Sequence, residues 1–455
     1  MKKLICVLLL CYCQSITGQN SIFPKGEIID SVLVGADSIE SFALYLPSQI
    51  NLSEPSSIIF IYEPMARGKI GIHPFIKAAE EYGYILVCSN NSRNGPFEEN
   101  FEIANRLFEK IFSDFTIDSK RVYTAGFSGG ARLASTIAIM TQQIQGVIAC
   151  GAGFSSTNYE LPHFNTFSYA AIVGDTDMNF KDMFITKGLL DRLKIPNELF
   201  VYEINHKWPD QEQILRAFDW MQLEAYKKGI IPTDHQNIKR IFSNYYYQAK
   251  KYEDENKLLS AFDEYYRIRK NFSKYYKSDS ISNKVNLIKN NKSYKKEKKN
   301  LVSSFEKEAI LTKSFLEQFN KDIGKTDHNL KWWISEINKL KKNLEKANFS
   351  EKKMLNRQLY KMFAVAIETV SIGNTVQHIN QAIFCYDICI LIYPKYPLPY
   401  FKQVENFINK NNEEEALNYL EKLLNSGYND IDAIKNNKIF EILKSNDRFI
   451  ELIKN

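Results

Sequence analysis

Residues 121–133 read Arg121-Val122-Tyr123-Thr124-Ala125-Gly126-Phe127-Ser128-Gly129-Gly130-Ala131-Arg132-Leu133. This stretch carries the pattern G-x-S-x-G between a run typical of a β-strand and a run typical of a helix. In such a turn the serine adopts a strained backbone conformation, and glycines beside it avoid clashes. The hydroxyl then lies at a helix N-terminus, where the helix dipole favours developing negative charge. Ser128 is therefore the predicted nucleophile.

Strand and helix patterns alternate on both sides of this stretch. The predicted strands are Ile28–Val34, Ser38–Leu46, Ser57–Tyr62, Tyr84–Ser89, Arg121–Ala125, Gly146–Cys150, Tyr169–Val173 and Leu199–Ile204. The predicted helices between and after them are Ile72–Tyr82, Phe97–Phe112, Ala131–Met140, Asp182–Leu193 and Gln211–Tyr226. Alternation of this kind predicts an α/β fold with a mostly parallel sheet covered on both faces. The first two strands are expected to form an antiparallel hairpin.

A serine nucleophile needs a histidine base and a carboxylate that orients it, and both should follow the later strands. His206 follows the last predicted strand, whereas His163 precedes a strand and so lies at the wrong end. Asp175 and Asp177 both follow the strand Tyr169–Val173. Because Asp175 is typical of a turn residue that bonds its own backbone, Asp177 is the predicted carboxylate.

Two backbone amides are needed to stabilise the oxyanion of an acyl intermediate. One is expected from Gly129, the residue after the nucleophile. The other is expected from the loop after Ser57–Tyr62, which begins Glu63-Pro64-Met65. Because proline has no N–H, Met65 is the predicted donor.

These residues resemble the α/β-hydrolase superfamily, in the branch of secreted esterases similar to polyhydroxybutyrate depolymerases, feruloyl esterases and dienelactone hydrolases. The resemblance spans residues 40–225 and is carried by residues 117–130, by Gly174-Asp175-Thr176-Asp177 and by His206-Lys207-Trp208-Pro209. It implies a catalytic triad of Ser128, Asp177 and His206. In the oxyanion loop the family usually has His-Gly, and this chain has Glu63-Pro64.

The N-terminus has the layout of a secretory signal peptide. Met1-Lys2-Lys3 is followed by the apolar run Leu4–Cys13 and by small and polar residues up to Gly18. This run is too short for a membrane-spanning helix, and no later stretch is typical of one. We predict a signal peptide over residues 1–18 and a protein that is periplasmic or secreted. A lipid anchor on Cys11 or Cys13 is disfavoured because bulky residues precede both.

The two halves of the remaining chain differ in charge. Residues 19–230 carry a net charge of −7 and residues 231–455 a net charge of +11. The second half is rich in Lys, Asn and Tyr and has helical periodicity, which predicts a hydrolase domain over 19–230 and an all-α domain over 231–455. Its lysines are expected on solvated helix faces, so no nucleic-acid partner is predicted.

A repeat pattern occurs near the C-terminus. Ala382, Tyr386 and Cys389 precede Pro394, and Ala416, Leu420 and Leu423 stand at the same offsets 34 residues later. Residues 375–427 thus resemble the tetratricopeptide repeat, whose surfaces usually bind proteins. An irregular helical bundle with one repeat-like hairpin remains the alternative.

The sequence as a whole favours an exported serine hydrolase that acts on a small-molecule or polysaccharide-linked carboxylic ester. No metal or cofactor is implied. Two alternatives remain open. One is a degenerate hydrolase domain whose helical half recruits a protein partner. The other is a serine peptidase of the prolyl-oligopeptidase type.

Overall fold

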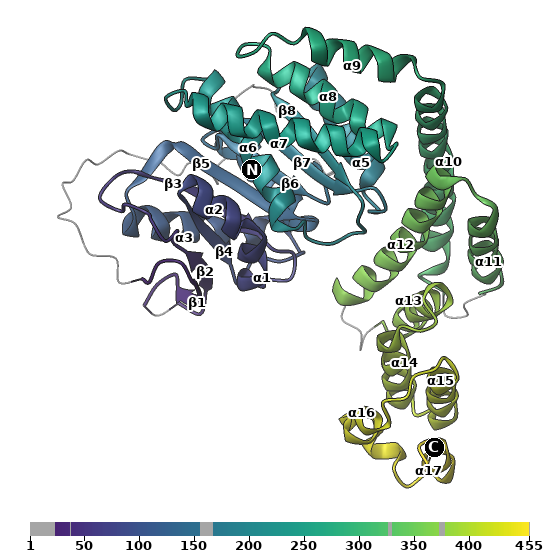
Figure 1. Cartoon of the computed structure of the whole chain (residues 1–455). Coiled ribbons are helices and arrows are strands. Elements are labelled where there is room, and N and C mark those ends of the chain that lie inside the picture. The colour runs from purple at the N-terminus through teal and green to yellow at the C-terminus, as the bar shows by residue number, and fades with distance from the viewer. Residues whose placement is uncertain (1–22, 37, 155–166, 326–329, 373–377, 455) are drawn as a thin grey trace. The chain divides into compact units, whose positions relative to one another are not determined.

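A computed structural model of the chain describes residues 23–36, 38–154, 167–325, 330–372 and 378–454. The predicted signal peptide and His163 lie outside the described residues. The chain divides into two compact units, Met1–Lys298 and Lys299–Asn455. The first unit holds the sheet, and the second is helical (Figure 1).

Within the described part of the first unit, eight strands form one sheet in the order β1-β2-β4-β3-β5-β6-β7-β8. The strands are β1 Ile28–Leu33, β2 Ser41–Tyr45, β3 Ser56–Tyr62, β4 Tyr84–Ser89, β5 Ile117–Phe127, β6 Gly146–Cys150, β7 Ser168–Gly174 and β8 Asn197–Tyr202. β2 pairs antiparallel with β1 and with β4, and the pairs from β4 through β8 are parallel. This confirms the predicted hairpin and the mostly parallel sheet of the α/β-hydrolase type.

Nine α-helices of the first unit follow or separate these strands, within the residues that the structure describes. They are α1 Gly68–Ile72, α2 Ile76–Tyr82, α3 Phe97–Asp114, α4 Gly129–Thr141, α5 Phe180–Arg192, α6 Gln211–Lys227, α7 His235–Asp254, α8 Leu258–Phe272 and α9 Asp279–Asn290. The predicted helix Ile72–Tyr82 is divided, because a short 3₁₀ turn at His73–Phe75 contains Pro74. Proline cannot donate a helical hydrogen bond, so the chain restarts as α2 after this turn.

Helices cover both faces of the sheet because successive residues of a strand point in opposite directions. Ile59 and Ile61 of β3 belong to a buried cluster with side chains of α2, α6 and α7. Phe60, between them, packs edge-on against Phe108 of α3 with ring centroids 4.4 Å apart. Thr124 of β5 lies opposite Phe60 and donates to a carbonyl of α4. α3 and α4 therefore cover the face opposite to α2, α6 and α7.

Helices α7 and α8 are part of the first unit, although they follow the change in charge near residue 231. The Tyr245 hydroxyl of α7 donates to the carbonyl oxygen of Arg216 in α6, at 2.9 Å. In α8, the buried guanidinium of Arg267 donates to the carbonyl oxygen of Leu199 in β8, at 2.8 Å. The first compact unit thus continues to Lys298, beyond the predicted boundary.

The second unit is all helical in its described part. Its elements are α10 Lys292–Asp322, which begins in the first unit, α11 Lys331–Lys346, α12 Phe349–Ile372, α13 Ile379–Ile392, α14 Pro397–Asn409, α15 Glu413–Asn425, α16 Ile431–Asn436, the 3₁₀ helix Lys438–Leu443 and α17 Asp447–Leu452. Ala382 of α13 and Ala416 of α15, related by the predicted repeat, are both buried. The tetratricopeptide interpretation stays a prediction.

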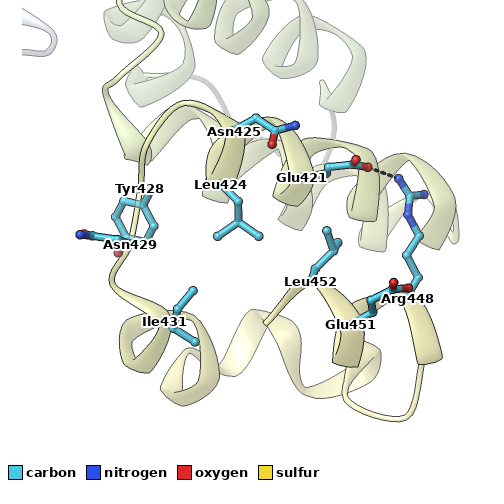
Figure 2. Close-up of a pocket in the computed structure, with 9 residues that line it drawn as sticks. All are labelled: Glu421, Leu424, Asn425, Tyr428, Asn429, Ile431, Arg448, Glu451 and Leu452. Atoms are coloured by element: carbon cyan, nitrogen blue, oxygen red, sulfur yellow. Dashed lines mark hydrogen bonds and ion pairs between the residues drawn. The ribbon is translucent and has the colours of Figure 1, made fainter. Parts of the chain in front are cut away.

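A hollow of about 540 Å³ lies between α15 and α17 in this unit. Figure 2 shows Leu424 and Leu452 pointing into it, with the ion pair between Glu421 and Arg448 at its edge. A protein partner for the helical region stays a prediction.

Two further features concern the whole described chain. None of its described helices is both long and apolar enough to cross a membrane. Cys88, Cys150, Cys385 and Cys389 are all buried and have free thiols.

Candidate active site

Ser128 lies in a sharp turn between the end of β5 and the start of α4. Its backbone angles are φ 53° and ψ −119°, a conformation with positive φ that is rare for residues with a side chain. The turn fits only because its neighbours are glycines. A Cβ on Gly126 would lie 2.3 Å from the carbonyl carbon of Gly130, and a Cβ on Gly130 would lie 2.0 Å from the carbonyl oxygen of Tyr62. The strained turn predicted for G-x-S-x-G is therefore present.

The backbone beside this turn holds Ser128 in place. The Ser128 amide donates to the carbonyl oxygen of Cys150, at the end of the neighbouring strand β6, at 2.8 Å. Burial raises the pKa of the Cys150 thiol, so this sulfur stays protonated and is a poor nucleophile. Ser128 itself is only 4% exposed.

His206 lies in the loop after β8, where the sequence places it. Its Nε2 atom is 3.0 Å from Oγ of Ser128. The ring packs on Phe127, the residue before the serine, with ring centroids 4.6 Å apart. One side of the imidazole therefore packs on a buried aromatic side chain.

Asp177 completes the arrangement from the loop after β7. Its Oδ2 atom is 2.8 Å from Nδ1 of His206, and its Oδ1 accepts from the amide of Asn179 at 2.8 Å. The carboxylate is 1% exposed. Thr176 ties the two loops together, because its amide and its hydroxyl both donate to the carbonyl oxygen of Ile204.

The structure therefore brings together the three predicted triad residues. Successive members are within hydrogen-bond reach, the geometry that a nucleophile, a base and an orienting acid require. Asp175, the other candidate acid, lies two residues earlier, and its amide donates to the carbonyl oxygen of Tyr202. A carboxylate on Nδ1 favours the tautomer in which Nε2 can accept the serine proton.

The predicted oxyanion donors differ in their surroundings. Gly129 is the first residue of α4, and amides in the first turn of a helix have no acceptor within the helix. The Met65 amide instead donates to Oε2 of Glu63, at 2.7 Å. Its hydrogen is directed to a buried carboxylate, which departs from the predicted role of Met65.

Asn94 is a neighbour of the site that the sequence reasoning missed. A Cβ on Gly129 would lie 1.8 Å from Oδ1 of Asn94, so the carboxamide packs directly against the residue after the nucleophile. One signal was available. Asn94 belongs to a polar loop that follows the buried strand β4, and the carboxyl ends of parallel strands meet at one edge of the sheet.

In the described part of the chain, no three His, Cys, Asp or Glu side chains lie together as a metal site would need. No protein-family model matches this sequence. No curated protein sequence matches it either.

Similar solved structures include an S-formylglutathione hydrolase from Staphylococcus aureus, at 12% identity and a TM-score of 0.35, covering 44% of this chain and 98% of that one. An esterase from Pyrobaculum calidifontis is 14% identical with a TM-score of 0.37, covering 44% of this chain and 86% of its own. A feruloyl esterase module from Clostridium thermocellum is 13% identical with a TM-score of 0.34, covering 40% and 83% respectively.

Proposed function

We propose that this protein is an exported serine hydrolase that cleaves a carboxylic ester through Ser128, His206 and Asp177. The observation that carries the proposal is the continuous pair of hydrogen bonds from Ser128 Oγ to His206 and from His206 to Asp177, at 3.0 and 2.8 Å. A strained serine backbone at the same position adds a second, independent feature of a nucleophile.

The first half of the reaction forms an acyl-enzyme. Oγ of Ser128 bonds to the carbonyl carbon of the ester while Nε2 of His206 takes the hydroxyl proton. Asp177 holds the imidazole and stabilises its charged form. The bond from the carbonyl carbon to the alcohol oxygen then breaks, and His206 returns the proton to the departing alcohol.

The second half releases the acid. A water oxygen bonds to the acyl carbon while His206 takes a proton from that water. The bond to Ser128 Oγ breaks and the serine recovers its proton from His206. In this proposal the Gly129 amide, in the first turn of α4, donates to the negative oxygen during both halves.

Labelling with a fluorophosphonate tests the nucleophile. We expect the full chain to gain one label on the peptide that contains Ser128, and the Ser128→Ala variant to gain none. Ser119→Ala is the matched control, because Ser119 is an exposed serine on the same strand β5. An unlabelled wild-type protein, or equal labelling of the Ser128→Ala variant, contradicts the proposal.

Turnover then separates ester from amide substrates. We expect the labelled protein to hydrolyse p-nitrophenyl acyl esters, followed by acylated oligosaccharides, and to leave aminoacyl p-nitroanilides intact. Faster cleavage of the anilides would favour the peptidase alternative. Labelling without turnover of either class would favour the binding-protein alternative.

Export is a separate part of the proposal and rests on residues 1–18 alone. It is tested by fractionating cells that express the full chain and sequencing the N-terminus of the product. We expect the protein outside the cytoplasm with Gln19 as its first residue. Cytoplasmic protein that retains Met1–Lys3 contradicts it.

A further inference from the structure

We propose that the side-chain carboxamide of Asn94 donates the second hydrogen bond to the oxyanion, beside the Gly129 amide. The inference rests on the proposed function, because an oxyanion forms only if Ser128 attacks an acyl group. In the sequence analysis this second hydrogen bond was expected from the backbone amide of Met65.

The backbone amide of Met65 already donates a hydrogen bond to the Glu63 carboxylate. The Glu63 side chain is fully buried, and its Oε2 accepts from the amides of Met65 and Arg67, at 2.7 and 3.1 Å. Its Oε1 accepts from the Arg67 guanidinium, at 2.5 Å. Turning the Met65 amide toward a substrate would remove one of these bonds from a buried charge, which is strongly unfavourable. A different donor is therefore needed on this side of Ser128.

Asn94 is fixed next to this same loop. Its amide donates to the carbonyl oxygen of Pro64, at 2.8 Å, and the preceding residue, Arg93, forms a β-bridge with Met65. Asn100 holds the other side of the turn, because its carboxamide bonds both the amide and the carbonyl of Arg93, each at 3.0 Å. The backbone that carries the Asn94 side chain is thus held in place before any substrate binds.

The carboxamide of Asn94 reaches the residue that follows the nucleophile. A Cβ on Gly129 would lie 1.8 Å from Oδ1, 2.8 Å from Cγ and 3.3 Å from Nδ2 of Asn94. Only glycine at position 129 leaves room for this approach. Among the hydrogen bonds of the described residues, none uses the Asn94 carboxamide, so both of its N–H donors are available to a substrate oxygen.

The carboxamide of Asn94 can turn either its oxygen or its amide group toward Gly129. Of the Asn94 atoms, Oδ1 lies nearest to the place of a Cβ on Gly129, at the positive N-terminus of α4, where an oxygen is favoured. When a negative oxygen occupies this place, the preference reverses. A half-turn about the last side-chain bond exchanges Oδ1 for Nδ2 without moving the rest of the residue. Asparagine side chains are among the groups that donate to the oxyanion in enzymes that transfer acyl groups.

The test compares Asn94→Ala and Asn94→Asp with the wild-type full chain, using a p-nitrophenyl ester that the wild type hydrolyses. Active sites are counted by end-point fluorophosphonate labelling, so that loss of folded protein does not enter kcat. We expect Asn94→Ala to lower kcat about 100-fold or more with KM changed less than about three-fold. Asn94→Asp, which has the same shape and no donor, is expected to lower kcat at least as much.

Asn91→Ala is the matched control, because Asn91 lies in the same loop and its Oδ1 accepts from the Ser41 amide instead. It should keep the wild-type kcat. A wild-type kcat in the Asn94 variants, or a rise in KM with kcat unchanged, overturns the role of Asn94. Absence of turnover in the wild type is a different result, because it contradicts the proposed function itself.

Discussion

Gly130 and Tyr62 meet through their backbones, with the Tyr62 carbonyl oxygen 2.0 Å from the place of a Cβ on residue 130. This contact sets α4 directly on the end of β3. It places the start of α4, and with it Ser128, at the edge of the sheet where the loops after β3, β7 and β8 meet. The second glycine of the motif therefore acts by allowing two elements to approach, and not by its own backbone angles.

Gly130→Ala is expected to disturb this approach. The added methyl group cannot move away, since it meets a main-chain carbonyl, and overpacking of this kind costs about 1–3 kcal/mol of the free energy of unfolding. Fluorophosphonate labelling should slow as Ser128 moves from His206. Both are measured on purified full-length protein, by urea unfolding and by the rate of labelling.

Gly188→Ala is the control for Gly130→Ala. Gly188 lies inside α5, and a Cβ there would have nothing within 4 Å. Because alanine favours a helix over glycine, this variant should be more stable by about 0.5–1 kcal/mol, with unchanged labelling. Equal changes in the free energy of unfolding and in the rate of labelling for the two variants would show that the contact with Tyr62 does not restrict residue 130.

Asp177→Asn tests the orientation of the imidazole. An amide in place of the carboxylate donates to Nδ1 and leaves the proton on Nε2, so His206 can no longer accept the Ser128 proton. We expect kcat to fall by about 10⁴-fold with the fold intact. The same substitution at Asp175, two residues earlier, should change kcat far less. An equal loss of kcat in the two variants would contradict the assignment of Asp177 as the residue that orients His206.

The strands near Ser128 could be predicted because their apolar runs are short and end at turn residues. Tyr84–Ser89 and Gly146–Cys150 have the predicted bounds. The residues that meet at the site could be predicted for a related reason. In a parallel sheet the order of strand ends along the chain restricts which side chains come together. The catalytic role of these residues remains the proposal above.

The shape of the loop after β3 could not be predicted because it depends on contacts within a few irregular residues. Ala66 has φ 59°, and the Glu63 carboxylate binds amides two and four residues later. Nothing in the spacing of Glu63-Pro64-Met65 indicates this turn. Asn94 was missed because its contact with Gly129 joins the loop after β4 to the first residue of α4, which is distant in sequence.

The C-terminal boundary of the first unit was predicted too early because the net charge of the chain changes near residue 231. Lysine-rich helices look alike in sequence whether they pack on a neighbouring sheet or not, and only the buried side of α7 and α8 distinguishes them. Ile238, Ile241, Ala261 and Tyr265 are all fully buried in the same cluster as α6. The amino-acid composition therefore changes near residue 231, whereas the first compact unit continues to Lys298.

Truncation tests how far the first unit extends. A chain of residues 19–230 would expose the side of α6 that packs on α7 and would lose the bond from Tyr245 to Arg216. We expect it to aggregate, and a chain of residues 19–298 to be soluble and to unfold cooperatively. Soluble expression and thermal unfolding followed by circular dichroism measure this. Equal unfolding midpoints for both chains would show that α7–α9 add nothing to the unit.

The second unit contains a buried ion pair between α10 and α12. Arg357 and Glu308 are 1% and 3% exposed in their side chains, and the guanidinium donates to both carboxylate oxygens. Arg357→Met leaves Glu308 as an unpaired buried charge and should cost about 3–5 kcal/mol of the free energy of unfolding. Adding Glu308→Leu should recover most of this, since two apolar side chains pack where the pair was.

The exposed pair between Lys307 and Glu351 joins the same two helices and provides the control. Lys307→Met should cost less than about 1 kcal/mol, because exposed charges are solvated with or without a partner. Hydrogen exchange of the α12 amides in the full chain reports this unit separately from the sheet. If Arg357→Met and Lys307→Met increase the exchange equally, or if adding Glu308→Leu recovers nothing, the buried charge is not what destabilises the variant. The loss would then come from the packing of the long arginine side chain.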